Sequence, residues 1–415
     1  MSNAIERRRR LAQILDLAQN YRGWTRKELA RRLGRDPTKL IPGSGIPKLD
    51  LVVKLAQVLD WKIDDVVSFF WASDENQVHI LDETDFEVID TMARKAHQDS
   101  QYTLMIDLAL HGFKHAVNDE QRARACNREA GGWDGLGRYQ DSMQAVQRGL
   151  QVPSVSGEFR RMMQSNLANA YYSLWSLVEA RAIASDLLDG FSEMPAETVR
   201  DRKTHAFAYY VSGQACRRLM SQHPELGDDH AAEAVHDLTE ARSRYLHLAE
   251  ELSNESLVGI ARTCEGALVE VDTIHRGRDP HEALSYLATG LDEAEVGPNE
   301  LAGDLLESLG WWCIFGCNIA LTCLGDERAL QKHMAIFTMK ADEIADRLDN
   351  WQIRERVFTM EHMRWERAVG CTGFDIPCLV DDEDVRVITG TMARFPTFQP
   401  TGWKILQSAS VVGKD

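Results

Sequence analysis

The sequence has few cysteines and no long uninterrupted apolar run. Eight cysteines in 415 residues are too few and too scattered for a disulfide framework. No window reaches the ~18 consecutive apolar residues of a membrane span, and the opening MSNAIERRRR lacks the apolar segment of a secretory signal. We therefore expect a protein of the reducing cytoplasm, in which Cys313, Cys317 and Cys323 are small buried apolar residues.

Motifs of catalysis and of cofactor binding are also missing. No Walker, dinucleotide-binding or nucleophile-elbow motif occurs, and the glycine-rich GGWDGLG at 131–137 follows a helical segment and is interpreted as a turn. The aromatic residues Trp311, Trp312 and Phe315 are more typical of a core than of a pocket. We expect no enzyme, no cofactor and no metal site, because no metal-ligand spacing relates the dispersed histidines His205, His223, His230, His236 and His247.

The charge is distributed unevenly along the chain. The formal net charge is −17, which by itself argues against nucleic-acid binding. Residues 1–70, however, hold 14 Lys and Arg against 8 Asp and Glu, a net charge of +6, so residues 71–415 carry −23. A small basic head on a long acidic body predicts that the head alone approaches a polyanion.

Helical periodicity dominates the sequence. Leu11, Ile14, Leu15 and Ala18 show the i, i+3, i+4, i+7 spacing of an amphipathic helix, and alternating strand patterns hardly occur. We predict an all-α fold with a boundary in the polar segment 72–84. The expected parts are a head domain at 1–72, a connecting segment and helix at 73–98, a helical repeat domain at 99–380 and a capping segment at 381–415.

The head reads as four short helices. The segment 25–33 predicts a helix with Thr25 as N-cap and Glu28 as its capping-box partner, and Gly34 supplies the turn that follows. Asp36-Pro37 is typical of the N-cap and first position of a second helix. Residues 47–60 and 63–70 predict two more helices.

This head resembles the Cro/repressor-type (XRE) helix-turn-helix family. ELA before a glycine turn and PKLDLVVKLAQVLDW further on carry the resemblance, which implies duplex DNA as partner and a recognition helix beginning at Asp36. The segment 35–43 is shorter than in that family, so a scaffold with a degenerate helix-turn-helix that does not read DNA is an open alternative. The resemblance implies base-edge or phosphate contacts from Arg35, Thr38 and Lys39, and phosphate contacts from Arg26, Lys27 and Lys48.

The acidic body resembles tetratricopeptide repeats. Residues 136–153 match the second half of such a repeat and 160–188 a full one, in which Leu167, Ala168, Tyr171, Ala180 and Ala184 take the packing positions. Divergent units follow at 204–249, 257–294, 305–337 and 351–395. Stacked repeats form a superhelix with a concave surface lined by the first helix of each pair.

The repeat frame places polar residues on that concave surface. Three carboxamides, Asn169, Gln214 and Asn318, fall at equivalent positions, and a carboxamide can hydrogen-bond the backbone of an extended peptide. An equally open interpretation is that these side chains only meet water. The full predicted set for a peptide or protein ligand is Ser165, Asn169, Tyr172, Tyr210, Gln214, Arg217 and Asn318.

Together these features predict a cytoplasmic, DNA-binding transcription regulator. Its plan is similar to that of peptide-responsive quorum-sensing regulators, which join a helix-turn-helix to a tetratricopeptide sensor. We expect a homodimer in which ligand binding alters the curvature of the repeats and thereby the spacing of two DNA-binding heads.

Overall fold

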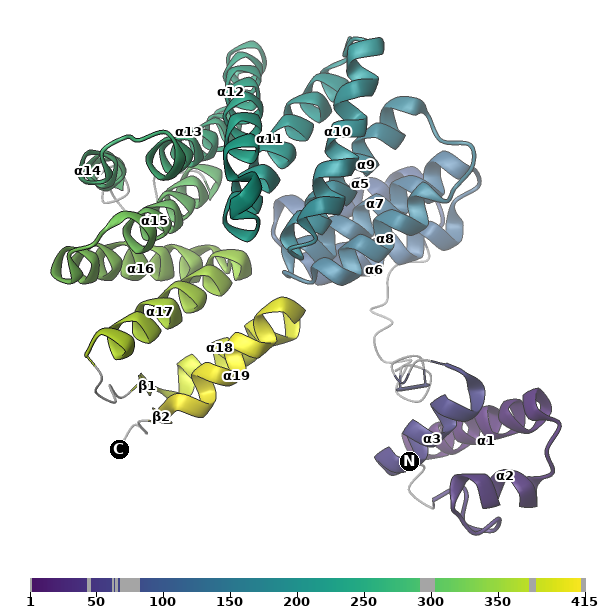
Figure 1. Ribbon diagram of the computed structural model, residues 1–415. Coiled ribbons are helices and arrows are strands. Elements are labelled where there is room, and N and C mark those ends of the chain that lie inside the picture. The colour runs from purple at the N-terminus through teal and green to yellow at the C-terminus, as the bar shows by residue number, and fades with distance from the viewer. Residues whose placement is uncertain are drawn as a thin grey trace. The chain divides into compact units, whose positions relative to one another are not determined.

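The computed structural model describes residues 2–42, 46–61, 63, 66–67, 83–291, 303–372 and 378–411. The chain folds as two compact units, Met1–Ile80 and Leu81–Asp415. Helices make up nearly all of the described residues (Figure 1), and one parallel pair of three-residue strands, β1 (Cys378–Val380) and β2 (Ala409–Val411), joins two distant segments of the second unit. The predicted all-α fold is confirmed.

The first unit contains α1 (Ser2–Arg22), α2 (Arg26–Leu33) and α3 (Leu49–Leu59). They share one apolar core, which includes the four residues whose periodicity predicted α1, and Leu29, Leu33, Leu40 and Leu55. Of the predicted helix at 63–70 the structure describes only Ile63, Val66 and Val67.

The predicted N-cap and the glycine turn of α2 form, but the predicted capping box does not. The Thr25 hydroxyl accepts a hydrogen bond from the Glu28 backbone N–H at 3.3 Å, while the Glu28 carboxylate pairs with Arg31 and Arg32 instead of completing a capping box. Gly34 adopts φ +66°, a left-handed conformation that costs glycine little. It therefore ends the helix.

The predicted second helix from Asp36 is wrong. Residues 35–41 form turns and bends, because the Asp36 carboxylate accepts hydrogen bonds from the Thr38 backbone N–H at 2.8 Å and from its hydroxyl at 2.6 Å. This Asx turn uses the same side chain that would cap a helix. Leu40, buried to 1% exposure, anchors the turn in the core, and Pro42 follows too soon for a helix to develop.

The second unit is an array of antiparallel helix pairs. The helices are α5 (Phe86–Gln98), α6 (Tyr102–His115), α7 (Asp119–Gly135), α8 (Tyr139–Leu150), α9 (Gly157–Ser173), α10 (Leu177–Glu193), α11 (Val199–Gln222), α12 (Gly227–Leu252), α13 (Ser256–His275), α14 (Pro280–Leu291), α15 (Gly303–Cys323), α16 (Glu327–Leu348), α17 (Trp351–Thr372), α18 (Asp382–Arg394) and α19 (Gln399–Ser408). Each packs mainly on its neighbours in sequence, and α5, α7, α9 and α11 also contact one another in series.

Small residues let the pairs approach closely. Ala168, Ala180 and Ala184 are fully buried at the predicted packing positions. A β-carbon at Gly213 would lie 2.7 Å from Leu238 Cγ on α12, so only glycine fits there without a shift of the helices. Leu167 and Tyr171 are half-buried.

The helix α5 belongs to this array and is not a separate connector. Phe86, Ile89, Ala93 and Ala96 are buried, and the side chains of Phe86 and Ile89 pack against Gly112 of α6. Its apolar stripe thus covers the first pair. The predicted connecting segment 73–98 contains this helix, and its residues 73–82 lie outside the described ones.

The largest part of the core lies around α15. Trp311, Trp312, Phe315, Cys313 and Cys317 are all buried to 7% exposure or less, as predicted, and Cys323 is half-buried. Among the described helices α15 is long and apolar enough to cross a membrane, and 72% of its most apolar window is buried inside the protein. It packs as a core helix.

The C-terminal segment folds back onto the first repeats. Arg394 Nε donates to the Leu136 carbonyl at 3.1 Å, and Gln352 Nε2 donates to Ser173 Oγ at 3.0 Å. The Trp351 ring stacks under the Arg394 guanidinium at 3.7 Å and touches Gly137. Within the predicted capping segment 381–415, Arg394 thus reaches the turn after α7, whereas the contacts with Gly137 and Ser173 come from α17.

Candidate functional site

The first unit presents exposed cations around α2. Arg26 and Lys27 lie in the first turn of α2, Lys39 in the turn that follows, and Lys48 just before α3. All four are exposed, and no ion pair is described for them within the residues that the structure covers. Such long cations can reach phosphate oxygens.

Arg35 and Thr38 are less available than predicted. Arg35 Nη2 donates to both oxygens of Asp50, and Thr38 is tied to Asp36 by the Asx turn, whose hydrogen bonds also lower the pKa of Asp36. A base-edge contact from Arg35 would have to break its ion pair. The four cations around α2 are thus the stronger candidates for contact with a polyanion.

In the second unit, three asparagines line a cavity of about 310 Å³. Asn127 comes from α7, and Asn166 and Asn169 come from α9; all three are half-buried. Asn166 Nδ2 donates to Asn127 Oδ1 at 3.0 Å, which orients the two amides. The cavity is also lined by Arg94, His97, Gln98, Met105, Arg128, Ala130, Gly131, Asp134 and Ser142. We call this the asparagine groove.

Arginines extend the groove on one side. A neighbouring cavity of about 300 Å³ shares Arg94, Asn127 and Arg128 and continues to Arg124 and Arg200. The buried carboxylate of Asp90 serves three arginines: Arg124 at 2.6 Å, Arg128 at 2.8 Å and Arg94 at 3.5 Å. Burial would raise the pKa of Asp90, but hydrogen bonds and charge from Arg128 and Arg124 lower it. Arg124 also pairs with both oxygens of Glu87, so two carboxylates against three guanidiniums leave one positive charge at this wall.

Two titratable groups in the groove have shifted pKa values. Partial burial and the charge of Arg128 lower the pKa of His97, so its imidazole is neutral near pH 7. The Asp134 carboxyl lines the cavity and its side chain is exposed to solvent there, while protein surrounds it on its other sides. This burial, with the negative charge of Glu307 on α15, raises the pKa of Asp134 to about 6.

Further along the concave face, a second group of polar residues closes on one carboxylate. Arg217 Nη1 lies 2.9 Å from both oxygens of Glu270, and Asn318 Nδ2 donates to Glu270 Oε1 at 3.2 Å. Arg217 Nε donates to Gln214 Oε1 at 2.8 Å. Arg217, Glu270 and Gln214 are each at most 4% exposed. We call these four residues the Glu270 cluster.

The seven residues predicted to bind a ligand therefore divide. Asn169 lines the asparagine groove, and Gln214, Arg217 and Asn318 meet in the Glu270 cluster. The predicted exposure of Gln214, Arg217, Ser165 and Tyr172 is wrong, because all four are buried. The Ser165 hydroxyl donates to the Met162 carbonyl of its own helix, the Arg218 guanidinium covers the Tyr172 ring at 3.9 Å, and half-buried Tyr210 stacks on Phe207.

Sequence reasoning missed Asn127, Asn166 and Arg128. Asn127 and Asn166 are 39 residues apart, close to the spacing of the repeats, and this periodicity was a signal available in the sequence. The predicted repeats start at residue 136, so the residues of α7 are not predicted to form the first helix of a pair. On α9, the predicted repeat positions assign Ser165 to the concave surface, whereas the neighbouring Asn166 lines the cavity.

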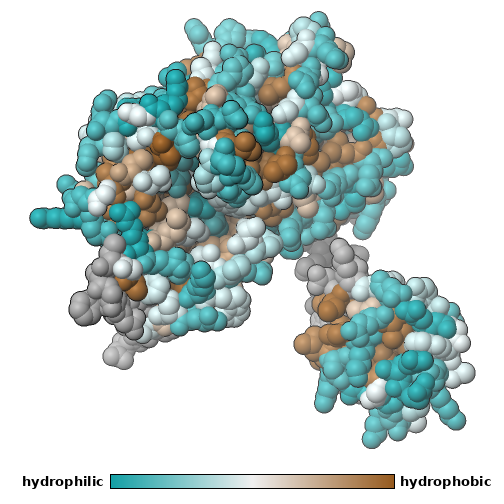
Figure 2. All heavy atoms as spheres, in the orientation of Figure 1, coloured by the Kyte–Doolittle hydropathy of each residue, from teal (hydrophilic) through white to brown (hydrophobic). Residues whose placement is uncertain are grey.

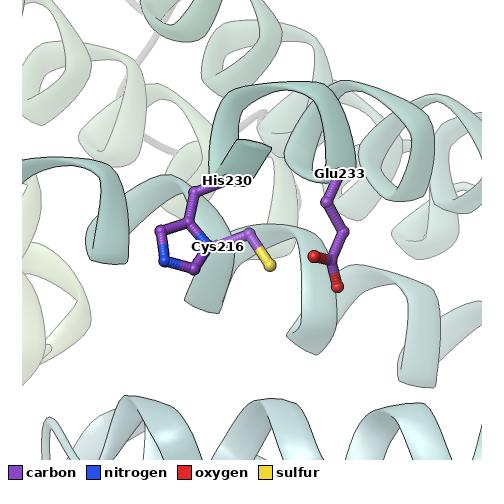
Figure 3. Close-up of side chains that lie close together, drawn as sticks. All are labelled: Cys216, His230 and Glu233. Atoms are coloured by element: carbon purple, nitrogen blue, oxygen red, sulfur yellow. The ribbon is translucent and has the colours of Figure 1, made fainter. Parts of the chain in front are cut away.

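Cys216, His230 and Glu233 lie close together between α11 and α12 (Figure 3). One ligand-type atom from each falls within 4.8 Å of the others, although no metal spacing in the sequence marks them. Arg181 binds both oxygens of Glu233, and burial raises the pKa of the Cys216 thiol. A protonated thiol and an already paired carboxylate are poor metal donors, so the chemistry of the three residues fits a structural ion pair better than a cation site.

Comparison with known proteins gives little. No family model and no curated protein matches the chain. Among solved structures, the crystal structure of PlcR from Bacillus thuringiensis in complex with the peptide PapR7 and DNA is similar with 12% sequence identity and a TM-score of 0.36. The match covers 69% of this chain and 95% of PlcR. At this TM-score the two folds differ too much for any residue to be carried from one to the other.

Proposed function

We propose that the first unit binds duplex DNA through its phosphates. The observation behind this proposal is the set of exposed cations Arg26, Lys27, Lys39 and Lys48 on a head of net charge +6. With a turn where a recognition helix would lie, the contacts fix position and add affinity without reading much sequence. Phosphate contacts of this kind supply most non-specific affinity.

A salt titration tests the DNA proposal. Binding of a fluorescent 20-base-pair duplex to the full chain is measured by anisotropy over a range of salt concentrations. Each phosphate contact contributes about −0.9 to the slope of log K against log salt. Lys27→Ala, Lys39→Ala and Lys48→Ala combined should reduce the slope by about 3. Replacing the exposed Lys95, Lys114 and Lys332 of the second unit removes the same charge and should leave the slope unchanged.

The second unit, we propose, senses a short acidic peptide in the asparagine groove. The observation that supports this is an open cavity into which Asn127, Asn166 and Asn169 bring three carboxamides beside Arg94 and Arg128. Carboxamides can donate to and accept from a peptide backbone, and guanidiniums bind a carboxylate side chain or a chain end. The protein would then be a ligand-responsive, DNA-associated regulator of the cytoplasm.

A defined peptide library tests the sensor. Random seven-residue peptides with one central Glu, and a matched set with Gln, are incubated with the full chain and analysed by native mass spectrometry. The proposal expects retained peptides from the Glu set and loss of retention in Asn169→Ala. Retention that does not differ between the two sets, or that survives the substitution, would contradict it.

A second candidate function is an interaction scaffold that does not bind DNA. The turn at 35–41 in place of a helix favours it, since no element of that segment is shaped to enter a major groove. The absence of duplex binding at moderate salt would select this alternative. Sedimentation of the full chain with and without duplex tests the homodimer that either function would use.

A further inference from the structure

A separate cavity of about 590 Å³ lies at the C-terminal end of the second unit. Its walls come from α16, α17, β1, α18 and α19, and none of its lining residues belongs to the asparagine groove. Its volume falls in the range of sites for small organic molecules, about 300–1,000 Å³. On the face visible in Figure 2, the second unit is largely hydrophilic with separate apolar patches.

The inner wall of the cavity is apolar. Val357 of α17, Val380 of β1, Ile388 of α18 and Ile405 of α19 line it and are each at most 7% exposed. Phe358 and Trp365 add aromatic surface from α17. Two apolar side chains on the rim remain in water, Leu379 with 63% and Met339 with 73% exposure. An apolar ligand body of moderate size would remove water from both.

The charged side chains around the cavity carry an excess of negative charge. Asp342, Glu361 and Asp384 line it together with Arg364 and His362. Glu361 forms an ion pair with Arg364 at 2.5 Å and accepts a hydrogen bond from the Thr338 hydroxyl. His362 Nε2 lies 3.2 Å from the Glu366 carboxylate. For Asp342 and Asp384, no ion pair is described among the residues that the structure covers.

Asp342 lines the cavity and remains exposed to solvent. Burial and the nearby carboxylates of Asp346 and Asp384 raise its pKa, against the charge of Arg354. Arg354 itself pairs with Asp346 and Asp349. Asp384 accepts only the Asp381 backbone N–H. Two carboxylates thus line the same cavity, and neither has an ion pair among the residues that the structure describes.

We propose that this cavity binds an organic cation with an apolar body, with the body against Val357, Phe358 and Ile388 and the cationic head at Asp342 and Asp384. An anion of the same size would meet three carboxylates. A neutral molecule would further bury Asp342 without compensating its charge, which costs free energy. The proposal does not depend on the function proposed for the asparagine groove, because the two cavities share no residue.

Three compounds with one body and different heads test the proposal. The full chain is titrated calorimetrically with 4-phenylbutylamine, 4-phenylbutan-1-ol and 4-phenylbutyrate. The amine should bind at least tenfold more tightly than the alcohol, and the carboxylate should not bind. Equal binding of amine and alcohol, or no binding of the amine, would overturn the proposal.

Two matched variants locate the cation. Asp342→Asn should reduce the affinity for the amine to that for the alcohol, about tenfold, while the affinity for the alcohol stays the same. Glu343→Gln removes the neighbouring carboxylate, which pairs with Lys340 at 3.1 Å and does not line the cavity, and it should change neither affinity. A preference for the amine that survives Asp342→Asn, in a variant with unchanged circular dichroism, would show that Asp342 does not hold the cation.

Discussion

The asparagine groove and the Glu270 cluster are two regions of one concave face, built from the same side-chain types. Each has carboxamides and an arginine. In the groove these are Asn127 and Arg128 on α7 and Asn169 on α9, and in the cluster they are Gln214 and Arg217 on α11 and Asn318 on α15. The groove is an open cavity, whereas the core residues of the cluster are buried. Residue type alone does not decide which of them can meet a ligand.

The two regions differ in the position of their carboxylate relative to the carboxamides. Glu270 on α13 reaches Arg217 and Asn318 from a middle helix and satisfies both. In the groove the corresponding acid, Asp90, sits to one side and holds three arginines, while the Asn169 amide faces the cavity. A buried donor needs a partner, and Glu270 supplies one to Arg217 and Asn318, although Gln214 Nε2 has none among the described residues.

The largest effect is expected from breaking the cluster. Glu270→Ala leaves Arg217 buried without its partner, and breaking a buried ion pair in this way costs about 3–5 kcal/mol. Chemical denaturation followed by circular dichroism at 222 nm should show that loss of stability. Asn318→Ala is the control, since it removes one hydrogen bond and should cost only about 1 kcal/mol. Equal stability of Glu270→Ala and the parent would mean that the cluster is not a closed structural unit.

Local rules predicted the packing of these regions but not their pairing. The helical period and small residues such as Ala168 and Ala180 follow from neighbours three or four positions away, so they are readable in the sequence. Arg217 and Glu270 are 53 residues apart, and only the stacking of three helices brings them together. For the same reason, the hydrogen bond from Arg394 to the Leu136 carbonyl could not be predicted from the sequence.

In the head, the prediction of a helix from Asp36 was wrong for a different physical reason. Asp36-Pro37-Thr38 satisfies the rules for a helix N-cap and also those for an Asx turn, and the number of residues available before Pro42 decides between them. The expected contacts of Arg35 assumed a free guanidinium, whereas Asp50 on α3 pairs with it. Exposed positions such as Lys27 were predicted well because exposure follows from the helix pattern alone.

A matched pair of asparagine substitutions sharpens the comparison between groove and cluster. Asn169→Ala should weaken a peptide that binds the groove by about tenfold, since it removes one or two hydrogen bonds of about 0.5–1.5 kcal/mol each, and should hardly change unfolding. Asn318→Ala should do the reverse, with altered stability and unchanged peptide affinity. Fluorescence titration with a peptide retained from the Glu library measures the affinities. If both variants weaken the peptide equally, the cluster also belongs to the ligand site.

The smallest expected effect is a pH dependence confined to the groove. The pKa of Asp134 is raised to about 6, so its carboxyl is mostly neutral at pH 5 and mostly ionised at pH 7.5. Because ionised Asp134 repels an acidic peptide bound beside it, the affinity should fall about threefold across this interval, the size of a Coulomb interaction at an effective dielectric between those of protein and water.

Asp134→Asn separates this effect from other titrations. The variant should keep the affinity of the pH 5 protein at pH 7.5, because its side chain stays neutral throughout. Burial and the charge of Arg128 lower the pKa of His97, so a residual pH dependence in Asp134→Asn would report the His97 imidazole, which also lines the groove. The Glu270 cluster offers no exposed titrating group to a peptide, so a pH dependence that persists when Asp134→Asn is combined with His97→Gln would place the ligand elsewhere than the groove.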